Sequence, residues 1–361
     1  MKKWLVSSLF LILLTGCNAA DEVSEPETPE ESAPEETPEP AQPEPEESEE
    51  PEEPLTEIAS GLDVPWSINK IGDEFYISER PGTVAYINED GEMTRQEVQF
   101  SDQVSGAAEA GFLGFVLKPN FEESQEAYAY YVYEDGGQSY NKIVSLVLEN
   151  EGWQESEVLL DDIPTGNVHH GGRLVLNDEG ILFATIGDAS NPDLAQDPDS
   201  VNGKILRLNE EGEFEIYSIG HRNPQGIAWA NGKMYAAEHG QSANDEINII
   251  EEGNNYGWPL IEGEQEEEGL EAPFVTTGSD ETWAPSGIAI NGGMLYAAAL
   301  RGNAIKVIDL ESGEVTGSIE DFGRVRDVYS EENDLYFVTN NTDGRGNPAD
   351  DDDKLYRMTI E

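Results

Sequence analysis

Six copies of a short two-segment pattern recur between residues 65 and 340 and restrict the possible folds more than any other feature. Each copy has a segment of small and apolar residues, then a turn, then a segment centred on an aromatic residue. The first segments are centred on Ile68, Val116, Val175, Ile227, Ile288 and Val328, and the second on Tyr76, Tyr128, Phe183, Tyr235, Tyr296 and Tyr336. The two centres are eight residues apart in five copies and 12 apart in the second, where FEESQ lengthens the turn.

The composition of the turns and the length of the repeat together predict a fold. Gly lies beside Asp or Asn in DEG, ANG and NGG, which favours β-hairpins. No long stretch has apolar residues with a helical period, so we expect little helix. Six units of roughly fifty residues, each starting with a hairpin, predict an all-β, six-bladed β-propeller. An irregular pair of β-sandwiches is the alternative, and the constant eight-residue spacing disfavours it.

The first 54 residues differ from the rest and predict two further segments. Two lysines and an apolar run too short to span a bilayer end in Leu14-Thr15-Gly16-Cys17, which resembles the lipobox of bacterial lipoproteins. We therefore expect residues 1–17 to be a lipoprotein signal peptide, cleaved before a lipidated Cys17; an ordinary secretory signal is the alternative. Residues 18–54 have 16 acids, no base and many prolines, which predicts a disordered tether. The expected location is extracytoplasmic, with the lipid as the only membrane anchor.

The charge of the remaining segment, residues 55–361, excludes one class of partner. It carries 17 bases and 60 acids, a net charge of −43. Nucleic-acid binding needs basic surface to neutralise phosphates, so we expect no nucleic-acid partner. This segment is long enough to form the whole propeller as a single catalytic or binding domain.

A propeller brings particular positions of the repeat together. The first strand of each blade lies nearest the axis, and its start lies on the same face as the end of its hairpin partner. Polar residues at these positions should therefore meet at one mouth of the central channel: Glu79, Arg80, Glu109, His169, His170, Asp188, Arg222, Asn223, Glu238 to Gly240, Ser286, Arg301, Arg324, Arg326 and Asn340. Five of the ten arginines of residues 55–361 are among them, which predicts a cationic pocket for a small ligand with several carboxylates.

Several short motifs at these positions resemble one family. They are HHGGRL (169–174), GHRNPQG (220–226), EHG followed by DEIN (238–248), NYGWP (255–259), APSG (284–287) and GRVRDV (323–328). In order and spacing they resemble the soluble quinoprotein sugar dehydrogenases, the glucose/sorbosone dehydrogenase family, over residues 55–361. The resemblance implies a six-bladed propeller that holds pyrroloquinoline quinone (PQQ) and calcium. It also implies oxidation of aldose sugars at C1 to lactones, with a quinone or cytochrome as electron acceptor.

The same resemblance implies roles for residues at matching positions. His169 would be the catalytic base that takes the proton of the sugar C1 hydroxyl, and Asp188 would orient its ring. Arg222 would stabilise the quinone oxygen that gains charge, with Asn223 at the same cofactor edge. Glu109 is placed with the cofactor residues, although glucose-oxidising members have Gln there; contact with the sugar or with its own strand is the alternative.

The remaining roles concern the cofactor carboxylates and calcium. Arg301, where the family has Lys, would bind the cofactor carboxylates together with Arg324 and Arg326. The carbonyl groups of Gly240 and Gln241 match those that bind the calcium beside PQQ, although Gln241 replaces a Pro of glucose-specific members. Glu246 and the carbonyl of Tyr256 match a second calcium site. In so acidic a chain, an incidental glutamate at position 246 is the alternative.

Two other functions remain open at this point. A calcium-dependent lactonase would need a carboxylate-rich metal cage at the channel, which the arginine cluster disfavours. A non-catalytic cell-surface binding module would keep the propeller without affinity for PQQ.

Overall fold

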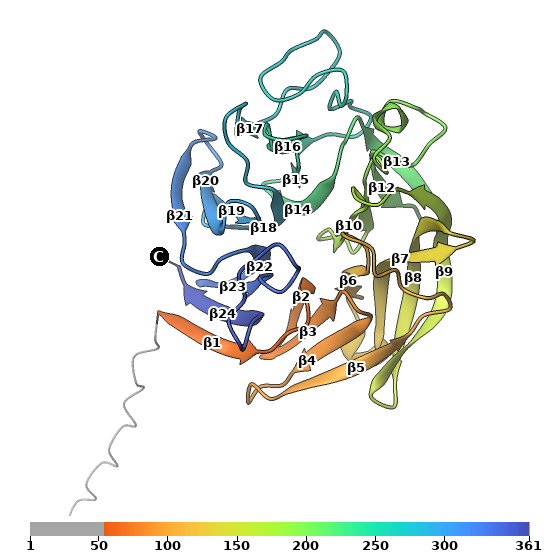
Figure 1. Cartoon of the computed structure of the whole chain (residues 1–361), viewed down its shortest axis with the longest axis vertical. Helices are drawn as coiled ribbons and strands as arrows, with labels where there is room; N and C mark the ends of the chain where they lie inside the picture. The colour runs from red at the N-terminus through yellow and green to blue at the C-terminus, as the bar shows by residue number, and fades with distance from the viewer. Residues whose placement is uncertain (1–53, 361) are drawn as a thin grey trace, which may run out of the picture. The chain divides into compact units, whose positions relative to one another are not determined.

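The computed structural model describes residues 54–360, which form β-sheet blades around a central axis (Figure 1). The first blade contains β2 (Pro65–Ile71), β3 (Glu74–Glu79), β4 (Thr83–Ile87) and β5 (Met93–Gln99). The second contains β6 (Phe112–Leu117), β7 (Glu126–Asp135), β8 (Gln138–Glu149) and β9 (Gly152–Thr165). The third contains β10 (Gly171–Leu176), β11 (Leu182–Ile186), β12 (Lys204–Leu208) and β13 (Phe214–Ile219).

Three further blades complete the circle, and in each the strands pair in sheet order. The fourth contains β14 (Pro224–Ala230), β15 (Lys233–Glu238), β16 (Glu246–Ile250) and β17 (Val275–Thr276). The fifth contains β18 (Pro285–Asn291), β19 (Met294–Ala299), β20 (Ala304–Asp309) and β21 (Val315–Ile319). The sixth contains β22 (Val325–Glu331), β23 (Asp334–Thr339), β24 (Lys354–Thr359) and β1 (Leu55–Ser60). The helical elements of the described residues are α1 (Phe121–Ser124) and the 3₁₀ turn η1 (Pro192–Ala195).

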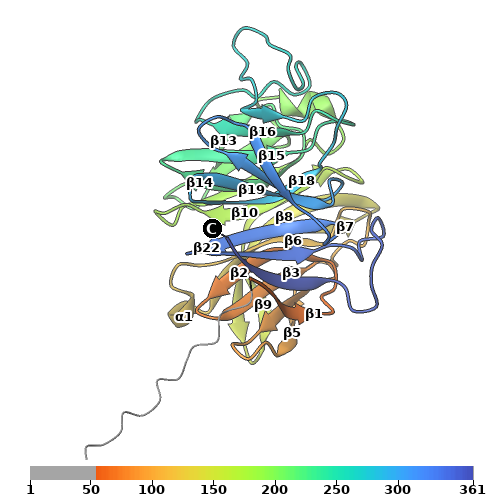
Figure 2. The same cartoon turned by 90° about the vertical axis from the view of Figure 1, so that its left-hand side faces the viewer.

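The ring of inner strands confirms the six-bladed propeller. Each of β2, β6, β10, β14, β18 and β22 contacts the next, and β22 contacts β2. The sixth blade is closed by β1, which pairs antiparallel with β24, so the first and last strands of the described chain share one sheet. The six predicted hairpins are the pairs of inner and second strands, and the FEESQ segment of the second copy forms α1. Figure 2 shows the blades from the side.

Apolar faces of neighbouring blades pack against each other and hold the ring together. Between the first two blades, Tyr76, Phe115, Phe121 and Trp153 form one buried aromatic cluster. Burying such side chains contributes about 1.5–3 kcal/mol each. The aromatic centres of the sequence repeat therefore fill the spaces between blades, and the polar residues of the inner strands are left to line the channel.

A bulge at the start of every inner strand determines which side chains face the axis. The pairing register shifts between Pro65 and Ile68 in the first blade and between Val325 and Asp327 in the sixth. The other four blades have the same shift at the same place. A bulge bends a strand and re-aims its side chains. The shifts thus turn residues at one end of each inner strand into the channel mouth.

An ion pair links two opposite inner strands across the axis of the propeller. Arg173 and Asp327 come from the third and sixth blades, which lie opposite each other, and their Nη2 and Oδ1 atoms are 3.1 Å apart. Both side chains are buried, and the Arg173 guanidinium lies 4.2 Å from the ring centroid of Trp66. Gly287 lets the fifth inner strand approach this pair, because an added Cβ would lie 1.6 Å from Asp327 Oδ1.

The expected signal peptide with Cys17, and the tether except for Pro54, lie outside the described residues and stay predictions. Within residues 54–360, no helix has the length and apolar character needed to cross a membrane.

Candidate active site at one mouth of the channel

A histidine–aspartate pair stands at the mouth formed by the starts of the inner strands. His169 lies just before β10 with a φ of 67°, and Asp188 lies just after β11. His169 Nδ1 is 2.8 Å from Asp188 Oδ1. The Trp258 indole donates to Asp188 Oδ2 at 2.9 Å, and the Ser190 amide donates to Oδ1 at 2.8 Å. A carboxylate held by these donors accepts from Nδ1, so the proton of the neutral imidazole is on Nδ1.

The other ring nitrogen of His169 faces Arg222. Arg222 Nη2 donates to His169 Nε2 at 3.0 Å, and Nη1 donates to the carbonyl of His239 at 3.1 Å. The guanidinium lies 5.4 Å from the ring centroid of Trp258. Burial lowers the pKa of Arg222 from its ordinary value. His169 therefore has its lone pair at Nε2, where it accepts a hydrogen bond from Arg222. A ligand that binds Arg222 would free this lone pair.

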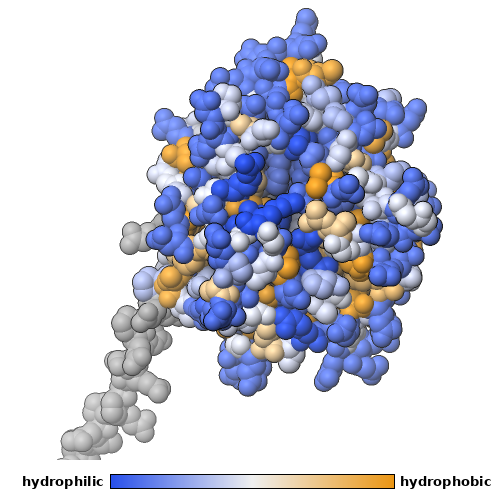
Figure 3. All heavy atoms as spheres, in the orientation of Figure 1, coloured by the Kyte–Doolittle hydropathy of each residue, from blue (hydrophilic) through white to orange (hydrophobic). Residues whose placement is uncertain are grey.

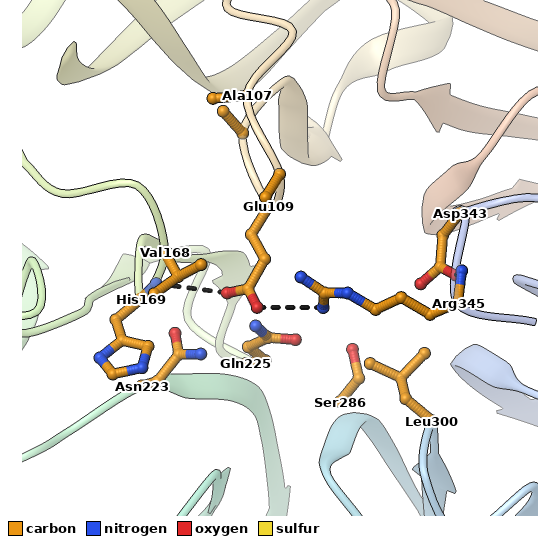
Figure 4. A network of polar contacts seen from close by, with 12 residues as sticks. Ala107, Glu109, Val168, His169, Asn223, Gln225, Ser286, Leu300, Asp343 and Arg345 are labelled. Carbon is orange, nitrogen blue, oxygen red and sulfur yellow. Dashed lines mark hydrogen bonds and ion pairs between the residues drawn. The ribbon is translucent and has the colours of Figure 1, made fainter. Parts of the chain in front are cut away.

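Glu109 crosses the mouth between two loops, as Figure 4 shows. Its Oε2 accepts the backbone N–H of His169 at 3.2 Å, and its Oε1 is 3.0 Å from Arg345 Nη1. Burial alone would raise the pKa of Glu109. The His239 imidazole, the His169 amide and Arg345 outweigh burial and lower that pKa to about 2. Arg80 holds the loop that carries Glu109, since its Nε donates to the carbonyl of Ala110 at 2.7 Å.

Further arginines crowd the same mouth. Arg326 Nη1 donates to Gln225 Oε1 at 2.9 Å, and burial together with the guanidinium of Arg80 lowers the pKa of Arg326 to about 9. Arg324 Nη2 pairs with Asp343 Oδ2 at 2.7 Å. Buried cations that repel one another fit a site that receives anionic groups.

Buried polar atoms without partners point to where such a ligand would bind. Within the described residues, these atoms include the Nε atoms of Arg222, Arg324 and Arg326 and the Nδ2 of Asn223. Asn223 Oδ1, in contrast, accepts the Gly171 amide at 3.0 Å. Buried donors are nearly always paired in folded proteins, so four open donors around one mouth indicate a missing ligand with several acceptor oxygens.

Two adjoining cavities form the centre of the mouth. The first is lined by Glu109, His170, Gln225, His239, Arg326 and Arg345 among others, and has a volume of about 20 Å³. The second is lined by His239, Arg222, Gly240, Glu246, Tyr256 and Trp258 among others. Figure 3 shows hydrophilic side chains gathered around the middle of this face. The ion pair between Glu109 and Arg345 narrows the first cavity, so a larger ligand requires these side chains to move.

The positions matched to calcium sites offer carbonyl groups more than carboxylates. In the described residues, the carbonyls of Gly240, Gln241 and Tyr256 accept no hydrogen bond. Glu246 is half-buried, and desolvation together with the charge of Glu238 raises its pKa to about 8. No group of three or more His, Cys, Asp or Glu side chains among residues 54–360 is arranged to hold a metal ion.

Many of the sequence-predicted site residues lie together, whereas Arg301 and Arg324 line a different cavity. His169, Asp188, Arg222, Asn223, Glu109 and Arg326 surround the two central cavities or contact their lining residues. Arg301 is exposed and lines a separate cavity with Arg324 and Asn341. Arg301 is absent from the lining of the cavity that contains Arg326, and its predicted contact with the cofactor carboxylates stays a prediction.

Sequence reasoning missed Trp258, Arg345 and Asp343. Trp258 lies in the NYGWP motif, which the sequence analysis singled out. The motif did not predict that Trp258 donates a hydrogen bond to Asp188. Arg345 and Asp343 lie in a Gly-containing loop after β23, just beyond the predicted mouth position Asn340. The sequence signal that could have identified Arg345 is an arginine in the loop that follows the last hairpin.

The fold and this site define a class of protein: a six-bladed propeller with a His–Asp pair and a buried cationic pocket at one mouth. The family model described as Glucose / Sorbosone dehydrogenase matches residues 62–356. The chain belongs to this family.

Named relatives agree with that assignment. The chain is 29% identical over 332 residues to the aldose sugar dehydrogenase YliI of Escherichia coli, covering 78% of this chain and 89% of the relative. It is 28% identical over 244 residues to quinoprotein glucose dehydrogenase B of Acinetobacter calcoaceticus, covering 55% of this chain and 50% of the relative. It is similar in structure to the PQQ-bound form of aldose sugar dehydrogenase from Streptomyces coelicolor, with a TM-score of 0.78, 31% identity and coverage of 85% and 98%.

Proposed function

We propose that this protein is a PQQ-dependent sugar dehydrogenase that oxidises aldoses at C1 to lactones. The observation that carries the proposal is the set of unpaired buried donors on Arg222, Asn223, Arg324 and Arg326 around the mouth that holds His169. The relatives named as aldose and glucose dehydrogenases, one of them bound to PQQ, support the same assignment.

The residues present fit PQQ, which carries three carboxylates and quinone oxygens. Arg324 and Arg326 would bind carboxylates, and Arg222 with Asn223 would contact quinone oxygens. Arg345, which at present pairs with Glu109, is a further candidate for a carboxylate. When bound, PQQ would supply the acceptor for the hydride that leaves C1 of the sugar.

His169 would act as the general base. Its Nε2 would accept the proton of the C1 hydroxyl after Arg222 turns from His169 to the ligand, and Asp188 would stabilise the imidazolium through Nδ1–H. Trp258 would keep Asp188 in place through its indole N–H. Proton transfer by a positioned base contributes about 10²- to 10⁴-fold to a rate.

Calcium beside the cofactor is part of the proposal. The open carbonyls of Gly240 and Gln241 would be its ligands, and Glu246 with the Tyr256 carbonyl would hold a second ion. The support is chemical: calcium binds carbonyl and carboxylate oxygens, and these groups have unused acceptor capacity.

The test is to add PQQ and calcium to the purified full chain and measure oxidation of glucose and other aldoses with an artificial electron acceptor. We expect sugar oxidation that depends on PQQ, and loss of that oxidation after a chelator removes calcium. An absence of PQQ binding would favour the binding-module alternative. Hydrolysis of lactones without any quinone would favour the lactonase and contradict the proposal.

A further inference from the structure

The tryptophan that holds Asp188 lies in a long loop. Asp188 is fully buried, and among residues 54–360 the Trp258 indole is the only side chain that donates to its Oδ2, at 2.9 Å. Trp258 belongs to residues 251–274, which connect β16 to β17 and form no strand or helix in the described structure (Figure 1). Strand pairing therefore does not fix the position of Trp258, and other contacts must do so.

Gln196 uses both ends of its side-chain amide on this loop. Its Nε2 donates to the carbonyl of Trp258 at 2.7 Å and to Asn255 Oδ1 at 3.0 Å. Its Oε1 accepts from Asn255 Nδ2 at 2.8 Å. Because a carbonyl group can only accept, the NH₂ group of Gln196 must face Trp258, and all three bonds form in that orientation alone. Gln196 thus fixes the backbone of Trp258 itself.

A buried ammonium group anchors the turn from which Gln196 extends. Gln196 directly follows η1, and Lys204 lies at the start of β12 with no exposed surface. Its Nζ donates to the carbonyls of Leu194, Ala195 and Asn202 at 2.8, 3.0 and 2.8 Å. Hydrogen bonds from a charged donor are stronger than those between neutral groups, so Lys204 holds the end of η1 in place.

These contacts form a continuous path from β12 to the ring of His169. Lys204 holds η1, Gln196 holds the backbone of Trp258, and the Trp258 indole holds Asp188. Asp188 Oδ1 in turn lies 2.8 Å from His169 Nδ1. A shift of Trp258 would therefore move Asp188 or remove one of its donors. A misplacement of about 1 Å at a catalytic group can lower a rate by about 10²-fold.

We propose that Gln196 is a positioning residue of the active site, which holds the Trp258 indole against Asp188 and thereby sets the orientation of the His169 ring. Gln196 lines neither of the two central cavities, so it acts through Trp258 and not by contact with a ligand there. This inference rests on the proposed function, because it assumes that His169 is the base. The competing explanation is that Gln196 stabilises the loop without any effect on the reaction.

The first test needs neither cofactor nor sugar. In ¹H–¹⁵N spectra of the full chain, each of the six tryptophans gives one indole signal, and Trp258→Phe identifies the signal of Trp258. Gln196→Ala should shift this signal and raise the solvent exchange rate of the indole proton by about ten-fold, the equivalent of one lost hydrogen bond. Gln196→Met keeps the length of the side chain without its hydrogen bonds, so it should give the same result even if the alanine variant folds poorly.

The matched control is Gln125→Ala. Gln125 also directly follows a short helical turn, α1, and its Nε2 donates to the carbonyls of Phe121 and Glu122 at 3.0 and 3.3 Å. It lies between the end of β6 and the start of β7, at the opposite end of the inner strand from the mouth. Gln125→Ala should therefore leave the Trp258 signal and the activity unchanged.

The second test measures glucose oxidation by the full chain loaded with PQQ and calcium. Gln196→Ala should lower kcat by about five- to fifty-fold and change KM by less than about two-fold, because Gln196 orients the base and does not bind the sugar. Trp258→Phe removes the same indole bond to Asp188. Adding Gln196→Ala to Trp258→Phe should therefore lower kcat by less than about two-fold more, since the two residues act through one contact.

The outcomes separate this inference from the proposed function. An unchanged indole signal in both Gln196 variants overturns the inference, and so does a changed signal with the kcat of the parent. If Gln196→Ala slows Trp258→Phe as much as it slows the parent, Gln196 acts on the fold in general and the inference is also overturned. If the loaded parent oxidises no sugar, the proposed function itself fails, and the indole signal alone decides whether Gln196 holds Trp258 against Asp188.

Discussion

The orientation of the His169 ring depends on side chains that reach it from different parts of the chain. Asp188 approaches Nδ1 from the end of the adjacent hairpin strand, which the repeat predicted. Arg222 approaches Nε2 from the next blade, and that bond was not predictable. The sequence pattern places a residue at a strand end, but the rotamers of two long side chains decide which atoms meet.

The role of Asp188 can be tested with a substitution that keeps the shape of its side chain. Asp188→Asn can donate from its amide to Nδ1, which would move the imidazole proton to Nε2 and remove the base. We expect kcat for aldose oxidation to fall by about 10²- to 10⁴-fold, with PQQ affinity little changed. Asp193→Asn, in the exposed η1 turn, is the matched control. Equal activity of both variants would remove Asp188 from the mechanism.

Glu109 makes a prediction about pH. Its pKa in the folded protein is about 2, below the ordinary value of 4.5, so its ionised form stabilises the fold at neutral pH. That contribution, at most about 3 kcal/mol, is lost as pH falls from about 4.5 towards 2. Thermal unfolding across this range should show the parent more stable than Glu109→Gln at pH 7, with the difference shrinking in acid. A difference independent of pH would contradict this account.

Among the elements, the six hairpins were predictable and the six bulges were not. The hairpins follow from Gly-rich turns and aromatic centres, which are local signals. The bulges depend on how closely neighbouring inner strands pack around the axis. That packing involves several blades, so the sequence of a single segment does not predict it. Gly287 is one residue whose identity reflects this close packing, because the absence of a side chain leaves space for Asp327 in the next blade.

Substitution of that glycine should be costly. In Gly287→Ala the new Cβ would lie 1.6 Å from Asp327 Oδ1, so the buried ion pair with Arg173 must move. We expect a loss of about 3–5 kcal/mol, the usual cost of breaking a buried pair. Gly317→Ala on β21, where the nearest atom to the new Cβ is 3.8 Å away, should change stability by less than about 1 kcal/mol. Urea unfolding of both variants would decide, and equal stabilities would contradict the assigned packing.

For the whole molecule, the ring of blades and the mouth that collects polar residues were predictable from six repeats. The closure of the sixth blade by β1 was not, since β1 lies outside the repeat pattern and its pairing partners in β24 are far away in sequence, from Met358 opposite Leu55 to Lys354 opposite Ser60. The exposed position of Arg301 beside Arg324 was not predictable either. Loops beyond the strand ends adopt conformations set by distant contacts, and the repeat does not constrain them.

The charge of the whole molecule gives a prediction about salt. A net charge of −43 over residues 55–361 makes the folded state repel itself, and salt screens that repulsion. We expect the Tm to rise by several degrees between about 10 mM and 500 mM NaCl, with most of the gain below about 200 mM. Differential scanning calorimetry measures this. A Tm that stays level or falls with salt would mean that local ion pairs outweigh the overall repulsion.

The ion pair of Arg173 with Asp327 links opposite blades across the axis, between the mouth that holds His169 and the opposite face. A cavity of about 480 Å³ lies on that opposite face, and Arg173 and Asp327 are both part of its lining. For an enzyme of the proposed kind, we expect sugar and electron acceptor to approach His169 from the same mouth. The two would then compete for that mouth, so excess sugar should slow the reaction with the electron acceptor.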